Sequence, residues 1–359
     1  MSDALLSPAI GMAFNAVSAG ALVFSAAKAK KDELSEKNIP LMGIAGALVF
    51  AGQMINFAIP GTGSSGHIGG GILLAGLLGG FPAFLSITAV LIIQCLFFAD
   101  GGLLALGCNI FNLGAIPCLV VYPLLFRPLI KKEVGYRRLS LASVVSVVAG
   151  LELGAFCVVL QTSASGITQL PFGVFLTFML PIHLAIGVVE GIVTAGILCF
   201  VFKMRPEILE GAKSGSRIGS GAPVKKVLAI LAVLTVVAGG VFSIFASANP
   251  DGLEWAIGKT EGTADMDAIS GAQTSGADTE TVNGAHAGGA DTDTISGVHA
   301  GAAAVQNELA FLPDYGFDGT YEDSGPLGAS ASGIIGAAIT FVLAGATGFI
   351  LSIRKKTKA

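Results

Sequence analysis

The chain has 359 residues, of which 53% are hydrophobic and only 12% are charged, and its mean hydropathy is +0.78. Because about a quarter of the residues of a soluble globular protein are charged, this composition excludes a soluble globule. The hydrophobic runs are continuous, whereas the strands of a membrane β-barrel alternate between apolar and polar residues. We therefore expect an all-α integral membrane protein, in which each spanning helix needs about 20 apolar residues.

The formal net charge of −4 conceals a segregation of the basic residues along the chain. Every Lys and Arg except Lys259 falls into one of four clusters, at residues 28–37, 127–138, 203–226 and 354–358. Positive charge near the ends of membrane spans stays in the cytoplasm. The clusters therefore predict a multi-pass protein of the cell membrane, with its N-terminus outside and its C-terminus in the cytoplasm. No cleavable signal peptide is expected, because no basic region precedes the first apolar run.

The apolar runs predict nine spans in chain order. They cover residues 7–27, 41–59, 68–78, 82–98, 103–126, 141–160, 172–202, 227–245 and 333–351. Between the second and third of these, the segment 60–67 is too rich in glycine for a regular helix. We expect residues 1–205 to form a seven-helix bundle, residues 206–226 a cytoplasmic linker, and residues 227–359 an accessory domain with two further transmembrane helices.

The last two predicted spans flank a long extracytoplasmic stretch that is strongly acidic. It contains three consecutive copies of one repeat, over residues 263–301. Low hydrophobicity with net negative charge predicts a partly disordered loop, and a solvated spacer is the simplest interpretation. The alternative is an arm that gathers cations weakly through the Asp and His side chains of the repeats, which include Asp278, Asp291, His286 and His299.

Polar side chains within the spans are few, and such groups are costly in lipid and indicate function. They are Gln53, Asn56, His67, Gln94, Asp100, Asn109, Asn112, Glu152, His183 and Glu190. Most belong to the outer half of the membrane, which favours a shared pocket that opens outward. For Gln94, Asn112 and Glu152 we favour hydrogen bonding between helices. For His67 we favour function, because irregular backbone at membrane depth must line a cavity or be buried in protein.

Several ordered motifs carry a resemblance to a known family. They are Asp3–Pro8 (DALLSP), Ala51–Phe57 (AGQMINF), Ser65–Gly70 (SGHIGG), Phe98–Asn109 (FADGGLLALGCN) and Pro181–Glu190 (PIHLAIGVVE). Together they resemble the substrate-binding membrane subunit of cobalt/nickel energy-coupling-factor transporters, the CbiM/NikM type. Residues Asn249–Trp255 (NPDGLEW) and Leu312–Tyr315 (LPDY) are similar to the accessory N-type, PDGLE-like subunit, which is fused to it here.

The resemblance implies a metal ion held by nitrogen donors in a roughly square-planar arrangement. The family donors are the free N-terminal amine, the backbone nitrogen and imidazole of a His at position two, and an imidazole after the second span. The corresponding residues here are Met1 and His67, and tetragonal nitrogen coordination suits Ni²⁺ or Cu²⁺. The implied cargo is Co²⁺ or Ni²⁺, between which the sequence does not choose, and no prosthetic group is expected. From the predicted topology alone, and not from the resemblance, we expect six further polar residues around the ion, namely Asn56, Ser65, Asp100, Asn109, His183 and Glu190.

The first residues depart from the family pattern. Position two is Ser2, and no His precedes His67. We expect the native chain to begin with Met-His upstream of Met1. The alternatives are a weaker site built from the Met1 amine, Asp3 and His67, or a degenerate subunit.

The resemblance implies a non-catalytic subunit that captures the substrate for an ATP-driven importer. Its implied partners are a membrane coupling subunit of the T or Q type and cytoplasmic ATPases, and no nucleic acid. Two other functions stay open. In Gly63–Gly66, Ser65 with His183 as base fits an intramembrane serine protease, although a nucleophile needs its base within about 3 Å. An ion-coupled secondary transporter would use Glu152, His183 and Glu190 as a relay, although no inverted repeat is evident.

Overall fold

Apolar helices dominate the structure, as the hydrophobic runs predict. The computed structural model describes residues 1–32, 38–131, 134–214, 224–262, 292–317 and 321–353. In that part of the chain, seven helical stretches are long and apolar enough to cross a membrane. They are α1 (Pro8–Asp32), α4 (Gly80–Phe98), the stretch Leu106–Leu129, α7 (Tyr136–Ser165), α8 (Phe172–Met204), α10 (Lys225–Gly240, with η3) and α13 (Tyr321–Ile353). The expected all-α membrane protein is therefore confirmed.

The second and third predicted spans are wrong in their bounds. Helix α2 (Asn38–Gln53) ends six residues before the predicted end at residue 59, and α3 (Gly71–Leu78) has only 8 residues. At 1.5 Å per residue, α3 is about 12 Å long, too short for a hydrocarbon core of about 30 Å. Between the two helices, β1 (Phe57–Ile59) and β2 (Ser64–Gly66) form an antiparallel hairpin. Its turn contains Gly61 and Gly63, both with positive φ, a conformation that glycine adopts readily.

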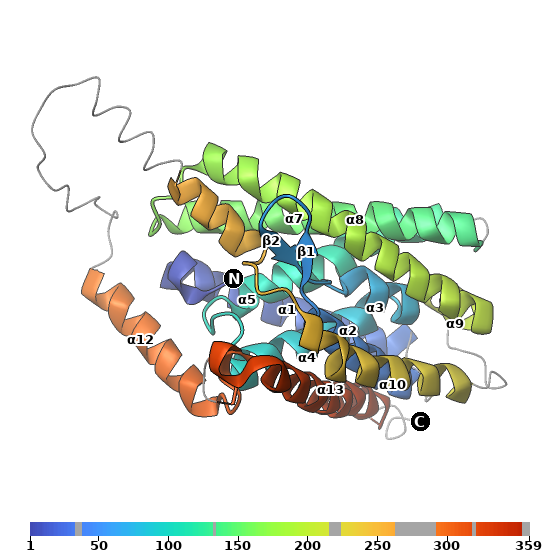
Figure 1. Cartoon of the computed structure of the whole chain (residues 1–359). Coiled ribbons are helices and arrows are strands. Elements are labelled where there is room, and N and C mark those ends of the chain that lie inside the picture. Colours follow the sequence, from blue (N-terminus) through green and yellow to red (C-terminus); the bar gives the residue numbers. More distant parts are fainter. Residues whose placement is uncertain (33–37, 132–133, 215–223, 263–291, 318–320, 354–359) are drawn as a thin grey trace, which may run out of the picture.

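The stretch Leu106–Leu129 runs through the centre of the bundle. It consists of α5 (Leu106–Asn109), the π-helical η2 (Ile110–Phe126) and α6 (Arg127–Leu129). Pro117 and Pro123 lie inside η2 and remove two N–H donors from the helical hydrogen-bond ladder. Helices α7 and α8 pack against each other, and α7 packs on η2 (Figure 1).

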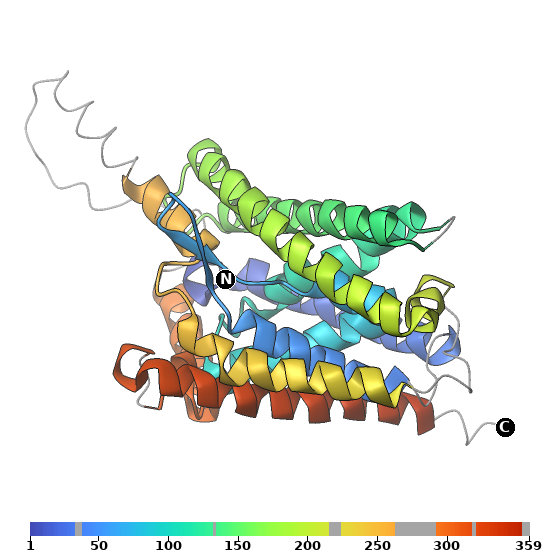
Figure 2. The same cartoon turned by 45° about the vertical axis from the view of Figure 1, so that its right-hand side comes forward.

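The accessory helices α10 and α13 lie against the bundle rather than apart from it. Figure 2 shows them side by side along α2, and α13 also contacts α4. The approach is close at one point, where a Cβ added to Gly239 would lie 2.9 Å from the Gly333 carbonyl oxygen. The predicted linker also contains structure, because α9 (Pro206–Ser214) packs on α3 and accepts a hydrogen bond from Tyr122 Oη at the Ala212 carbonyl, at 2.8 Å.

We expect Gly333→Val to destabilise the contact between α10 and α13. The added side chain would meet the Gly239 backbone, and overpacking of this kind costs about 1–3 kcal/mol. The matched control is Gly345→Val on the same helix, because nothing lies within 4 Å of a Cβ added there. The measurement is the thermal midpoint of the purified protein in detergent. Equal midpoints for the two variants would contradict the close packing.

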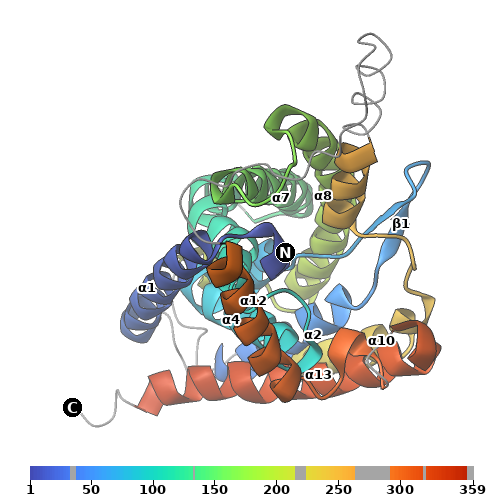
Figure 3. The ribbon, with the colours of Figure 1, turned by 90° about the vertical axis from the view of Figure 1, so that its left-hand side faces the viewer.

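The stretch between α10 and α13 is more ordered than its composition predicts. It includes a helix over residues 252–262, α12 (Thr292–Leu309) and η4 (Pro313–Tyr315). Figure 3 shows α12 beside α1 and α4. Gln306 anchors this helix, because its Nε2 donates to the carbonyls of Gly101 and Cys95, at 2.6 and 2.9 Å.

Most of the third repeat, from Thr292 to Gly301, lies in α12, so the expectation of disorder is wrong for that part. His299, which we considered as part of a cation-gathering arm, instead pairs through Nε2 with the Leu6 carbonyl at 3.0 Å. Residues Asp278, His286 and Asp291 of the same interpretation lie outside the described residues.

Candidate metal-binding site

The first residues are held against the segment that follows α4. The Met1 carbonyl accepts hydrogen bonds from the Gly102 N–H and from Asn109 Nδ2, both at 3.1 Å. The Asp3 carboxylate accepts a hydrogen bond from the Ala105 N–H at 2.8 Å, just before α5 begins. These contacts fix the backbone of Met1 and so restrict where its amine can lie.

His67 follows β2 on non-helical backbone before α3. Its Nδ1 lies 3.2 Å from the Ile68 carbonyl oxygen. When Nδ1–H donates to that oxygen, Nε2 keeps its lone pair and is the nitrogen that can bind a metal ion. The next residues are held by neighbouring helices, since Gln53 Nε2 donates to the Gly69 carbonyl at 3.1 Å and the Gly70 N–H donates to Glu190 Oε1 at 2.8 Å.

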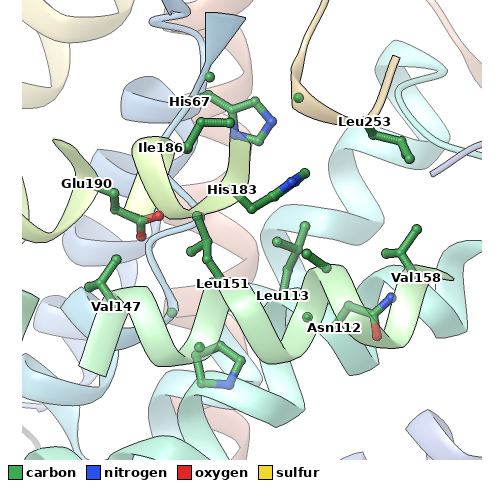
Figure 4. Close-up of a pocket in the computed structure, with 18 of the residues that line it drawn as sticks. His67, Asn112, Leu113, Val147, Leu151, Val158, His183, Ile186, Glu190 and Leu253 are labelled. Carbon is green, nitrogen blue, oxygen red and sulfur yellow. The ribbon is translucent and has the colours of Figure 1, made fainter. Parts of the chain in front are cut away.

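Two cavities meet at these residues. The inner cavity has a volume of about 140 Å³ and extends between η2, α7 and α8 (Figure 4). The outer cavity has a volume of about 290 Å³ and extends toward η4. Both are lined by Met1, His67, Asn109, Leu113 and Asp251. Since about 10–15 Å³ of such volume admits one water molecule, each cavity has room for a hydrated ion.

The structure brings most of the predicted site residues to these cavities. Asn56 and Asp100 line the outer cavity, and His183 and Glu190 line the inner one. Ser65 lines neither. It is fully buried, and its hydroxyl donates to the Asn249 carbonyl at 2.8 Å.

The expected hydrogen bonding between helices is confirmed for two of three residues. Asn112 and Gln161 exchange two amide hydrogen bonds, at 2.8 and 3.1 Å. Gln94 Nε2 donates to Gln53 Oε1 at 3.0 Å. Glu152 differs, because its Oε1 is buried without a hydrogen-bond partner in the described part of the protein.

The accessory segment supplies two cavity-lining residues, Asp251 and Glu254, that were not among the predicted site residues. Asp251 and Glu254 form a capping box at the start of the helix over residues 252–262, because Glu254 N–H donates to Asp251 Oδ1 at 2.8 Å and Asp251 N–H to Glu254 Oε2 at 3.3 Å. This Asp-x-x-Glu spacing is a recognisable helix start and could have been found in the sequence. Its position over the cavity could not, because that depends on contacts between distant segments.

The same segment is attached to the hairpin and closes over the inner cavity. The Ser65 N–H donates to the Pro250 carbonyl at 2.7 Å, and Trp255 Nε1 donates to the Thr62 carbonyl at 2.9 Å. Gly252 permits the close approach, since a Cβ added there would lie 3.1 Å from His183 Cε1. The PDGLE-like motif is thus a lid on the site.

Acidic groups gather around the outer cavity, which is lined by Asp100, Asp251, Glu254 and Asp314. Burial raises the pKa of Glu254, and the charge of Asp251 raises it further. Burial and then the charge of Asp100 raise the pKa of Asp314. The same two causes hold the pKa of Tyr315 well above its usual value, and its hydroxyl donates to Asp100 Oδ2. A concave surface lined by one sign of charge concentrates counter-ions, here cations.

A metal ion bound where the two cavities meet needs a donor in addition to His, Cys, Asp and Glu side chains. Within the described ranges, no three His, Cys, Asp or Glu side chains converge to hold one. The N-terminal amine is a nitrogen donor of another kind, and Met1 lines the same cavities as His67. Amine and imidazole nitrogen together suit Ni²⁺, Cu²⁺ and Co²⁺ better than Mg²⁺ or Ca²⁺, which prefer oxygen.

Known proteins match the chain over both of its parts. Residues 1–208 match the CbiM family model, described as a cobalt uptake substrate-specific transmembrane region, and residues 225–287 and 275–353 match the PDGLE domain. A Haloquadratum walsbyi protein, provisionally named for metal transport, is 34% identical over 212 residues, 58% of this chain and 91% of that protein. An Archaeoglobus fulgidus protein, provisionally named a fused nickel transport protein NikMN, is 35% identical over 213 residues, 56% of this chain and 63% of that protein.

A solved structure has a similar fold over more than half of the chain. The crystal structure of a truncated transition metal transporter aligns with a TM-score of 0.50 and 28% identity, over 57% of this chain and 98% of that one. The alignment with the fused relative reaches less than two thirds of that protein's length. Because the CbiM model covers more than half of its residues, the chain belongs to the CbiM family of cobalt uptake substrate-specific transmembrane regions, fused to a PDGLE domain.

Proposed function

We propose that this chain captures Co²⁺ or Ni²⁺ from outside the cell for an ATP-driven importer of the energy-coupling-factor type. The observation that carries the proposal is that Met1 and His67, far apart in sequence, line the same two cavities. The Met1 amine and His67 Nε2 would be the protein donors to the ion. Imidazole binds metal in its neutral form, so binding should weaken in acid.

The remaining parts of the importer would be separate proteins. A family described as the substrate-specific region of an uptake system implies that other subunits drive the uptake. We expect a coupling subunit of the T or Q type and cytoplasmic ATPases to bind the end of the bundle that carries the basic clusters. The N-terminus and the outer cavity would face the exterior, as the positive charges indicate.

The geometry favours neither of the other two functions. Ser65 gives its hydroxyl hydrogen to the Asn249 carbonyl, whereas a protease would need that hydrogen to reach His183. A proton relay would need Glu152, His183 and Glu190 in hydrogen-bond sequence. In the structure, His183 Nδ1 instead pairs with the Met179 carbonyl at 2.8 Å, and Glu190 accepts from Gly70.

A chain extended by Met-His before Met1 should bind Ni²⁺ more tightly than the chain with Ser2 at the second position. The added His supplies the backbone nitrogen and imidazole that the family pattern places there. We expect a gain of at least about tenfold in affinity, which corresponds to about 1.4 kcal/mol. A Met-Gln extension of the same length is the matched control. Calorimetric titration measures both, and equal affinities would count against an N-terminal metal site.

A further inference from the structure

Glu190 is a fully buried acidic residue that lines the inner cavity. The proposed function gives this residue no role. Its side chain is 1% exposed, and it extends from the middle of α8. Figure 4 shows its carboxyl group and the imidazole rings of His67 and His183 around the inner cavity.

The two carboxylate oxygens of Glu190 have different surroundings. Oε1 accepts the hydrogen bond from the Gly70 N–H at 2.8 Å, immediately before α3 begins. Oε2 is buried and makes no hydrogen bond of good geometry with the described protein atoms, although the Gly69 N–H also lies close to this carboxyl group. A Cβ added to Gly69 would lie 3.5 Å from Oε2, so this oxygen lies beside the backbone two residues after His67. Because a buried polar atom without a good partner is destabilising, Oε2 is available to bind a ligand from the inner cavity.

The chemistry of this ligand is that of a cation. A protonated carboxyl group would place an O–H donor at Oε2, and that donor would in turn need an acceptor. A carboxylate oxygen is instead a ready ligand for divalent metal ions. The cavity volume of about 140 Å³ leaves room for the waters of a partly hydrated ion. Water must complete the coordination, since the described His, Cys, Asp and Glu side chains form no group of three around an ion.

We propose that Glu190 forms an inner binding position, at which a partly hydrated Co²⁺ or Ni²⁺ ion contacts Oε2 below the Met1–His67 site. This rests on the metal-capture function proposed above and adds a second position on the path into the bundle. The carboxylate supplies the negative charge that the neutral imidazole of His67 lacks. A divalent ion is thereby stabilised within the low-dielectric bundle.

The test compares Glu190→Gln with Glu152→Gln in the full chain. The first substitution keeps an oxygen that can accept from the Gly70 N–H but removes the charge. The second neutralises a carboxyl group on α7 that lines neither cavity. In calorimetric titration with Co²⁺, the wild type should show a second binding event at the inner position; Glu190→Gln should weaken that event at least about 10-fold and leave the Met1–His67 event in place, and Glu152→Gln should leave both unchanged. Wild-type affinity in Glu190→Gln would overturn the proposal.

A further variant and a second measurement separate the possible failures. His67→Ala tests only whether His67 is a ligand in the metal site of the proposed function. Its outcome is therefore independent of the comparison between Glu190→Gln and Glu152→Gln. If Glu190→Gln does not fold, crystals of the unchanged chain saturated with Co²⁺ decide the matter. Anomalous scattering beside Oε2, at about 2.0–2.2 Å for direct contact or one water molecule further away, would support the inner position. A map without such a peak would overturn it.

Discussion

His67→Ala should abolish high-affinity binding of Co²⁺ and Ni²⁺ to the purified chain. The imidazole is the side-chain nitrogen donor that we assign to the ion, and its Nε2 is available when Nδ1–H donates to the Ile68 carbonyl. We expect a loss greater than the roughly 10–100-fold typical of residues that only support a site. Metal-dependent shifts of the thermal midpoint, followed by calorimetry, measure the effect.

His299→Ala is the matched control for that loss. This histidine also pairs with a backbone carbonyl, that of Leu6, but it lines neither cavity. Its variant should bind the metal as the wild type does. Retained tight binding in His67→Ala would refute the assignment, and an equal loss in both variants would show that the effect is not specific to the site.

Removal of residues 248–330 should reduce metal uptake by about an order of magnitude or more, since lids of this kind complete and close a binding site. The deletion removes the helix over residues 252–262, which is attached to the hairpin through Trp255 and Thr62. It should leave the protein folded, because α10 and most of α13 still pack on α2. Residues 241–247 and a short linker can rejoin the ends, since in the intact chain Ser330, next to the cut, donates through Oγ to the Gly240 carbonyl at 2.7 Å. Uptake of radioactive Co²⁺ in cells with the partner subunits, normalised to the protein in the membrane, measures the effect.

A pair of point variants tests the same lid more finely. Gly252→Val would press a side chain against His183 and Ile186, whereas nothing lies within 4 Å of a Cβ added at Gly258 on the same helix. Gly252→Val should therefore reproduce the transport defect of the deletion, and Gly258→Val should transport normally. Normal transport by the deletion would refute a role for the lid, whatever the point variants do.

Hydrophobic continuity predicts the long helices well because lipid requires it of every spanning segment. The predicted spans at residues 82–98 and 172–202 differ by only two residues at one end from α4 and α8. The same reasoning fails between residues 54 and 70. There the apolar sequence of β1 resembles the end of a helix, but the Gly-rich turn that follows folds it back as a hairpin.

His67 could be singled out from the sequence because it stands on backbone that cannot be helical. Its neighbours in space could not, because they come from distant segments. The Ser65 hydroxyl and the Asn249 carbonyl are 184 residues apart in sequence, and no local pattern specifies such a contact. Asp251 reaches the outer cavity through this docking. Asp314 reaches it through the contacts of η4 with α4, where the Leu312 N–H donates to the Phe97 carbonyl at 3.3 Å.

X-ray absorption spectroscopy of the full chain loaded with one equivalent of Ni²⁺ tests the ligand assignment most directly. We expect a shell of nitrogen and oxygen donors that includes imidazole scattering, and the disappearance of that imidazole signal in His67→Ala. A spectrum without imidazole in the unchanged chain, or with the same imidazole signal after His67→Ala, would contradict the assignment.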